Sequence, residues 1–366
     1  MKILAQSIIY DNPMPHLRSR HSAFPFLCEC DDGTLVAAHS LREAFESVDG
    51  SSNCSFSYDG GKTWSDPIFI KKPVHNGRNF SNSCKITNCG DGKLVGIGYG
   101  FYRDNPELPL GNAQTGGLLD DEVFYVISED NGKTWSEIQS IQCLWGPHVE
   151  ASAPITVLQD GAWVTPITGF PAWDGTMTGP VCGRVLRSED QGKTWNDDAV
   201  CMEFDEPVLC YEQRMCQLES GTLVCIAWNE NMKTGERLDN HYTYSVDNGK
   251  TWSKPISTGI RGQASFVGAI GGEKLIALHA IRRDTDRPGI YAYVIDFSDK
   301  TWKIVDEALL WEPNAPILRD KNMAEVFAFL KFGQPSAIKL KDGNLMMCHW
   351  FAENGQYKTI ATRIEL

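Results

Sequence analysis

The chain contains 366 residues, of which 42% are hydrophobic and 22% charged, and its formal net charge at pH 7 is −13. This composition excludes a disordered or collagen-like chain and fits one large domain or two ordinary ones. The acidic balance, without a cluster of Lys or Arg, argues against nucleic acid or an anionic membrane as a partner. No signal peptide or membrane-spanning stretch is recognisable, so we expect a cytoplasmic protein whose 12 Cys are mostly buried thiols.

An apolar segment at residues 3–10 is the first predicted strand, and six similar units follow it. Each unit opens with an apolar strand, a turn of the Asp-Gly kind and a second apolar strand, which is typical of an antiparallel hairpin. The turns are Asp32-Gly33, Asp91-Gly92, Asp160-Gly161, Ser220-Gly221, Gly272-Glu273 and Asp342-Gly343. Six turns predict six units, and residues 3–10 are expected to complete the last of them.

A second repeat occurs later in the units, with the pattern S-x-D-x-G-x-T-W. Four copies match it fully, at residues 57–64, 128–135, 188–195 and 245–252, and a degenerate copy covers residues 296–302. In such a turn the Asp accepts backbone N–H groups, the Gly adopts a positive φ and the Trp packs the turn onto its sheet. We interpret this repeat, the Asp box, as structural and not as a calcium loop.

The two repeats together predict an all-β fold, a six-bladed β-propeller with four-stranded antiparallel blades, as a single domain over residues 1–366. The predicted blades cover approximately residues 18–72, 76–142, 148–204, 209–258, 261–312 and 330–366, with residues 1–10 closing the ring. Strands that run up and down place the Asp-Gly turns and the Asp boxes on one face. The long polar loops after the second strands lie on the opposite face, where we place the functional site.

The blade count, the Asp boxes and the Asp-Gly turns resemble the sialidase superfamily, also called Asp-box or BNR repeat proteins. The resemblance implies three Arg that hold a carboxylate, an Asp acid/base, and a Tyr nucleophile assisted by a Glu. Glu212 resembles that Glu in position, and Arg42, Arg282 and Arg283 lie where substrate-binding Arg are expected.

The chain also departs from the family pattern. The arginine of the first blade is absent in strict register, and Arg20 is a candidate to replace it. The Tyr expected at the start of the sixth blade is missing, because the sequence there is Gly333-Gln334-Pro335-Ser336. A retaining mechanism through a covalent tyrosine intermediate needs that group. We therefore predict weak or absent strict sialidase activity.

Three histidines occupy one position in consecutive blades, because His39, His279 and His349 each lie six residues after the turn position of their unit. This spacing suggests that they converge in one cavity at the axis. Three interpretations remain open: recognition of an anion together with acid/base chemistry, a metal site, or three structural histidines between blades.

The sequence thus predicts a sialidase-like glycoside hydrolase, exo-acting on a glycan with an acidic sugar such as sialic acid, and no cofactor. A uronate-oligosaccharide hydrolase or lyase with a His base and a non-catalytic glycan-binding propeller are the alternatives. Acidic groups in the loops and inner strands, Glu150 and Glu230 among them, are candidates for paired-carboxylate chemistry. The catalytic candidates are Glu212, Glu46, Asp49, His39, His279 and His349. The substrate-binding candidates are Arg20, Arg42, Arg214, Arg282, Arg283, Tyr102, Trp228 and Trp350.

Overall fold

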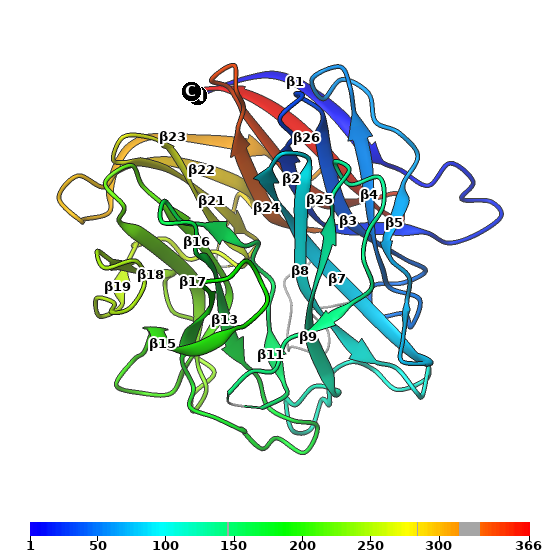
Figure 1. Cartoon of the computed structure of the whole chain (residues 1–366), viewed down its shortest axis with the longest axis horizontal. Helices are drawn as coiled ribbons and strands as arrows, with labels where there is room; N and C mark the ends of the chain where they lie inside the picture. The colour runs from blue at the N-terminus through cyan, green and yellow to red at the C-terminus, as the bar shows by residue number, and fades with distance from the viewer. Residues whose placement is uncertain (145, 284, 315–329) are drawn as a thin grey trace.

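A computed structural model describes every residue except 145, 284 and 315–329. In this part of the chain, all regular structure is β-strand, and the strands form six antiparallel sheets arranged around a central axis (Figure 1). The prediction of an all-β, six-bladed β-propeller is therefore confirmed. No helix of the described residues is long and apolar enough to span a membrane.

Four of the blades have four strands each. Blade 1 consists of β2 (His21–Glu29), β3 (Leu35–Arg42), β4 (Ser51–Ser57) and β5 (Ile68–Lys71). Blade 4 consists of β16 (Val208–Gln217), β17 (Leu223–Asn231), β18 (His241–Ser245) and β19 (Ile256–Ser257). Blade 5 consists of β20 (Ser265–Gly271), β21 (Lys274–Ile281), β22 (Gly289–Asp296) and β23 (Lys303–Trp311). Blade 6 consists of β24 (Phe332–Lys339), β25 (Leu345–Glu353), β26 (Gln356–Glu365) and β1 (Lys2–Tyr10).

Blades 2 and 3 have five strands, one more than predicted. Blade 2 consists of β6 (Val74–His75), β7 (Arg78–Gly90), β8 (Lys93–Tyr102), β9 (Asp121–Ser128) and β10 (Gln139–Ser140). Blade 3 consists of β11 (Val149–Glu150), β12 (Thr156–Val157), β13 (Trp163–Gly169), β14 (Gly183–Ser188) and β15 (Asn196–Met202). Its inner strand is divided into β11 and β12, with Pro154 between them, a residue that has no N–H to donate to a ladder.

The N-terminal strand closes the ring. β1 pairs with β26 in antiparallel register, so that the blue and red ends of the chain lie side by side in Figure 1. Ser7 of β1 also reaches blade 1, because its hydroxyl donates to the Gly61 carbonyl at 2.5 Å and accepts from Trp64 Nε1 at 3.0 Å. The predicted role of residues 3–10 is confirmed, and the closing strand links the last blade to the first.

The Asp boxes have the predicted chemistry. In the box of blade 4, Asp247 accepts hydrogen bonds from the backbone N–H and the hydroxyl of Thr251, at 2.9 and 2.6 Å, and Gly249 has φ 84°. Asn248 of this box donates to Asp160 in the Asp-Gly turn of blade 3 at 2.9 Å. Because this contact joins the two kinds of turn, they lie on one face of the disc, as predicted.

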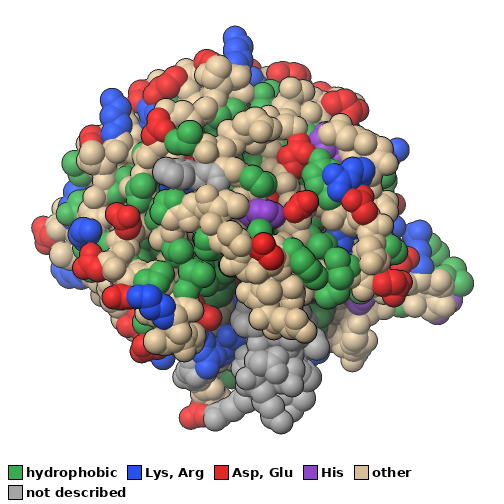
Figure 2. All heavy atoms as spheres, turned by 90° about the horizontal axis from the view of Figure 1, so that it is seen from below, with side chains coloured by type: hydrophobic (Ala, Val, Ile, Leu, Met, Phe, Trp, Pro, Cys, Tyr) green, Lys and Arg blue, Asp and Glu red, His purple; other side chains and the backbone are tan. Residues whose placement is uncertain are grey.

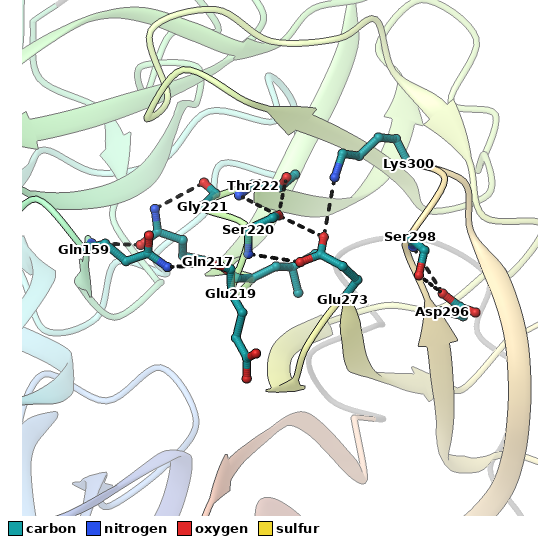
Figure 3. Close-up of polar contacts among 11 residues, drawn as sticks. Gln159, Gln217, Glu219, Ser220, Gly221, Thr222, Glu273, Asp296, Ser298 and Lys300 are labelled. Atoms are coloured by element: carbon teal, nitrogen blue, oxygen red, sulfur yellow. Dashed lines mark hydrogen bonds and ion pairs between the residues drawn. The ribbon is translucent and has the colours of Figure 1, made fainter.

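The same face carries a polar network between blades 4 and 5 (Figure 3). The Glu273 carboxylate accepts from the backbone N–H of Ser220 at 3.0 Å and from its hydroxyl at 2.8 Å, and Lys300 Nζ lies 3.4 Å from the same carboxylate. Gln217 Oε1 accepts the Gln159 N–H of blade 3 at 2.9 Å. Turns of adjacent blades are thus linked directly, and this face is occupied by structural contacts.

The core lies between the blades. In the described residues the buried apolar side chains form six clusters; five join two neighbouring blades, and one combines residues of blades 5 and 6 with Phe26 of blade 1. All 12 Cys are free thiols, and all except the half-buried Cys89 and Cys143 are buried. Such a ring of clusters makes the blades a rigid support, on which loops and inner strands are held in fixed positions.

Candidate functional site

The inner strands of blades 1, 4 and 6 each carry a bulge at the end opposite the Asp-Gly turns. The pairing register shifts between Ala23 and Phe26 in β2, between Tyr211 and Arg214 in β16, and between Gly333 and Ser336 in β24. Within these bulges Phe24, Glu212 and Gln334 have φ values of 57°, 47° and 44°. Positive φ is uncommon for residues other than Gly, and such strained positions cluster at functional sites.

Glu212 is the centre of this region. Its carboxylate accepts a hydrogen bond from Trp228 Nε1 at 2.9 Å and another from Nε2 of Gln334, which belongs to blade 6. The backbone N–H of Glu212 donates to Glu150 Oε2 of blade 3 at 3.1 Å. Residues from blades 3, 4 and 6 therefore meet around Glu212.

Glu150 and Glu212 form a carboxylate pair. Glu150 is buried, and burial together with the nearby Glu212 carboxylate raises the pKa of Glu150 to about 7, while Ser152 and the Glu212 N–H act in the opposite direction. A like charge disfavours ionisation of a neighbour, so burial and the nearby Glu212 favour the protonated form of Glu150. A carboxyl group that keeps its proton near neutral pH is able to act as an acid.

Three cations are buried around the same axis. Lys85 of β7, Arg42 of β3 and Arg214 of β16 are 3%, 5% and 3% exposed. Burial, with Arg214 as the next cause, lowers the pKa of Lys85 to about 7, and burial lowers the pKa of Arg42 to about 10. On the side of the molecule seen in Figure 2, by contrast, acidic and basic side chains are interspersed at the surface.

The hydrogen bonds of these cations go to neutral groups. Lys85 Nζ donates to the Phe24 carbonyl at 2.6 Å and to Gln334 Oε1 at 3.2 Å. Arg214 donates to Ser152 Oγ at 3.0 Å, and Arg42 donates to the Phe45 carbonyl at 2.8 Å and lies over the Phe24 ring. Within the described residues none of the three forms an ion pair. Because buried charges are normally paired, this cluster is suited to an anionic ligand.

Several sequence-predicted residues are brought together here. Glu212, Arg214 and Trp228 lie on blade 4, and Arg42 joins them through Phe24. Arg282 donates to the Phe332 carbonyl at 3.0 Å and packs against Gly333, where a Cβ atom would meet its Nη1 at 2.9 Å. Arg282 therefore borders the bulge that carries Gln334.

Other candidates have structural contacts instead. Glu46 Oε2 accepts the Leu110 N–H at 3.3 Å, and Asp49 Oδ1 accepts the Glu43 N–H at 3.0 Å, so both carboxylates tie loops together. Tyr102 donates to Glu122 within blade 2. Trp350 is buried and packs against Phe24, Phe45 and Tyr357, so its contacts are those of a core side chain.

Arg20 and Arg283 are half-buried and lie near groups outside this cluster. The charge of Arg20 acts on Tyr10 of β1, and that of Arg283 acts on Glu230. The structure gives neither of them a contact with Glu212, Glu150 or Gln334.

The expected convergence of the three histidines is wrong. His39 stacks on Tyr10 and contacts Ser22 and Ser55, His279 packs against Tyr293, and His349 packs against Trp311 and Phe351. Each is at most 2% exposed, and burial lowers the pKa of each to about 3. They have separate surroundings, His39 and His349 at contacts with a neighbouring blade and His279 against Tyr293 of its own blade, because side chains of a second strand point to the faces of the sheet and not to the axis.

No group of three or more potential ligands for a metal ion is formed by the described residues. The three histidines share no contact, so the structure does not assemble the metal site that was one interpretation of their spacing. The sequence interpretation also overlooked Lys85 and the role of Gln334. The available signals were a Lys between the apolar residues Cys84 and Ile86 of a predicted strand, and a Gln at the start of the sixth blade, where the Tyr is expected.

Comparison with known proteins agrees with this architecture. Residues 111–347 match the family described as "BNR repeat-like domain". A protein of unknown function from Dyadobacter fermentans is 18% identical with a TM-score of 0.77, and the alignment covers 100% of this chain and 99% of that chain. A search of curated proteins gave no match.

Sialidases are among the similar structures. The Trypanosoma rangeli sialidase is 18% identical with a TM-score of 0.67, over 94% of this chain and 55% of that chain. The NanB sialidase from Streptococcus pneumoniae is 13% identical with a TM-score of 0.66, over 98% of this chain and 70% of that chain. At these identities the likeness concerns the fold.

Fold and site together define a sialidase-like β-propeller with a polar, charged centre. The chain belongs to the family described as "BNR repeat-like domain".

Proposed function

We propose that the protein is a glycoside hydrolase that acts on a glycan with an acidic sugar. The observation that carries this proposal is the carboxylate pair of Glu150 and Glu212, which lies at the axis beside buried cations that form no ion pair within the described part of the chain. Glycosidases commonly use two carboxyl groups, one as acid and one as base or nucleophile. The family likeness supports a carbohydrate ligand, since the similar structures include sialidases with bound sialic acid analogues.

The two carboxyl groups take different roles in this proposal. Glu150, whose pKa is raised to about 7 by burial and by Glu212, protonates the glycosidic oxygen as the bond breaks. The carboxylate of Glu212 stabilises the positive charge that develops on the sugar. Its two oxygens accept hydrogen bonds from Trp228 and Gln334, which keeps them in place for this task.

Arg42, Arg214 and Arg282 bind the acidic group of the sugar. Arg42 and Arg214 are buried and keep N–H groups beyond those used in their hydrogen bonds, because a guanidinium has five donors. The acidic sugar in this proposal is sialic acid or a uronate at the end of the glycan, and the enzyme is exo-acting. A lyase with a His base is not supported, because the three histidines are buried away from the axis.

The test is turnover of a panel of fluorogenic glycosides that carry neutral sugars, uronates or sialic acid. We expect release from at least one acidic glycoside, and we expect Glu212→Gln and Glu150→Gln each to lower kcat by roughly 10²–10⁴-fold. Glu122→Gln is the matched control, because Glu122 lies in blade 2 with Tyr102 and should leave kcat within about twofold.

Binding of acidic sugars without any turnover would identify a glycan-binding propeller instead. Turnover that survives both substitutions would place the catalytic groups elsewhere in the molecule.

A further inference from the structure

A chain of hydrogen bonds crosses the axis from blade 2 to blade 4. Lys85 Nζ donates to Gln334 Oε1 at 3.2 Å, and Gln334 Nε2 donates to the carboxylate of Glu212. Lys85 is itself held by the carbonyl of Phe24 in blade 1 at 2.6 Å. Four inner strands therefore contribute to the environment of one carboxylate.

Lys85, the first donor in this series of hydrogen bonds, sets the direction of the bonds that follow. A carboxamide has an accepting end and a donating end, and either can face a given neighbour unless another contact selects one. An ammonium group has three N–H donors and no acceptor, so Lys85 in its charged form faces the oxygen of Gln334 and leaves the nitrogen for Glu212. Trp228 Nε1, which can only donate, occupies the other carboxylate oxygen of Glu212 at 2.9 Å.

We propose that Lys85 and Gln334 are positioning residues. Lys85 orients the Gln334 amide, and the N–H group of that amide holds Glu212 in the reactive position. This inference rests on the proposed function for the reaction that Glu212 serves. Gln334 occupies the place where the family resemblance predicts a Tyr, and it supplies a fixed donor there. Lys85 acts through Gln334 and does not need to touch the sugar.

Two substitutions test the two hydrogen bonds separately, the one between Lys85 and Gln334 and the one between Gln334 and Glu212. Gln334→Glu keeps an acceptor for Lys85 but removes the N–H donor and places a second carboxylate against Glu212. Lys85→Met keeps an apolar stem of similar length and removes the group that orients the amide. Lys341→Met is the matched control, because Lys341 Nζ also donates to backbone carbonyls, those of Cys30 and Asp31, on the face of the Asp-Gly turns.

With the best acidic glycoside, we expect both substitutions to lower kcat about tenfold or more while KM changes less than about threefold. The double variant should lose little beyond Gln334→Glu alone, because both changes break the same chain. Lys341→Met should retain the parent kcat. If Lys85→Met raises KM for acidic sugars and leaves kcat unchanged, Lys85 contacts the substrate and the proposal is wrong.

A second readout does not depend on turnover. With ¹⁵N-labelled glutamine, the side-chain amide signals of Gln334 are assigned by their loss in Gln334→Glu. We expect Lys85→Met to shift or broaden these signals and to speed their exchange with water, whereas Lys341→Met leaves them unchanged. Unaltered signals in Lys85→Met overturn the positioning role even if the enzyme is active. Altered signals in a protein that cleaves no glycoside support the hydrogen-bonded chain and reject only the proposed function.

Discussion

An amide, that of Gln334, lies at the start of the sixth blade, where the resemblance to sialidases predicts a Tyr nucleophile. Gln334 is hydrogen-bonded to Glu212, the residue expected to assist that nucleophile, and an amide cannot form the covalent intermediate. We therefore expect a fluorogenic sialoside to be cleaved at least about 100-fold more slowly than the best acidic glycoside of another class. Initial rates at saturating substrate provide the comparison. Efficient release of sialic acid would show that another group replaces the Tyr.

The pH dependence follows from Glu150. Burial and the Glu212 carboxylate raise its pKa to about 7, so the group is protonated and able to act as an acid below that pH. We expect kcat/KM to fall about tenfold for each pH unit above about 7. By the same linkage, the stability that Glu150 contributes through its proton is lost as pH rises through about 7. Profiles of kcat/KM from pH 5 to pH 9 measure the decline in activity.

Lys85 titrates in the same range, because burial and Arg214 lower its pKa to about 7. Lys85→Met is therefore the informative comparison, and its residual activity should keep the alkaline decline if Glu150 is the acid. Glu150→Gln should lose the decline together with most of the rate. A decline that persists in Glu150→Gln and disappears in Lys85→Met would assign the acid role to Lys85.

The residues of the site were only partly predictable. The position of Glu212 is predictable from the sequence, because an inner strand that ends at the turn of Ser220 and Gly221 places its first residues at the opposite face. The same reasoning failed for His39, His279 and His349, since depth along a second strand does not bring a side chain to the axis. Gln334 and Lys85 become meaningful only through contacts between blades, which no local pattern contains.

At the scale of single elements, the fold was predictable because each turn carries its own chemistry. The Asp boxes and Asp-Gly turns fix hairpins locally, and their repetition gives the number of blades. The extra strands of blades 2 and 3 were missed because they are only two residues long. The formation of a two-residue strand depends on its pairing with the neighbouring strand and not on the periodicity of its own sequence.

The Asp box of blade 4 provides a test at this scale. Asp247 accepts hydrogen bonds from the hydroxyl groups of Ser245 and Thr251 and from two backbone N–H groups of the turn. Because the site is largely exposed, we expect Asp247→Ala to lower the free energy of unfolding by only about 1 kcal/mol. Urea unfolding measures this loss. Asp299→Ala, in the exposed turn of blade 5, is the control and should leave the urea midpoint unchanged; equal effects would contradict a specific role of the box.

For the molecule as a whole, ring closure depends on contacts between the last and first blades. Ser7 of β1 donates to the Gly61 carbonyl and accepts from Trp64 Nε1. Ser7→Ala leaves both groups without this partner, and we expect a loss of about 1–3 kcal/mol in the free energy of unfolding. Gln6→Ala is the comparison, because Gln6 bonds to Thr362 within the same blade at 3.3 Å. Equal losses in the two variants would show that this link adds nothing to closure.

The buried histidines make the assembled ring sensitive to acid. Burial lowers the pKa of His39, His279 and His349 to about 3, whereas the unfolded chain binds these protons near pH 6.5. Their contribution to stability is therefore present above pH 6.5 and is lost as pH falls toward 3. Three protons taken up on unfolding correspond to about 4 kcal/mol per pH unit below about pH 6. Equilibrium unfolding in urea between pH 4.5 and pH 7.5 measures this slope.

One substitution isolates a single histidine of the three. His349 packs against Trp311 and Phe351, and neither ring nitrogen has a hydrogen-bond partner among the described residues, so a Phe fits the same apolar surroundings. We expect His349→Phe to lower the acid slope by about one third, since one of three protons is no longer taken up. His16→Gln, at an exposed position before β2, is the control and should leave the slope unchanged. If His349→Phe also leaves the slope unchanged, His349 is protonated in the folded protein, and a buried neutral imidazole between blades 5 and 6 is the wrong description.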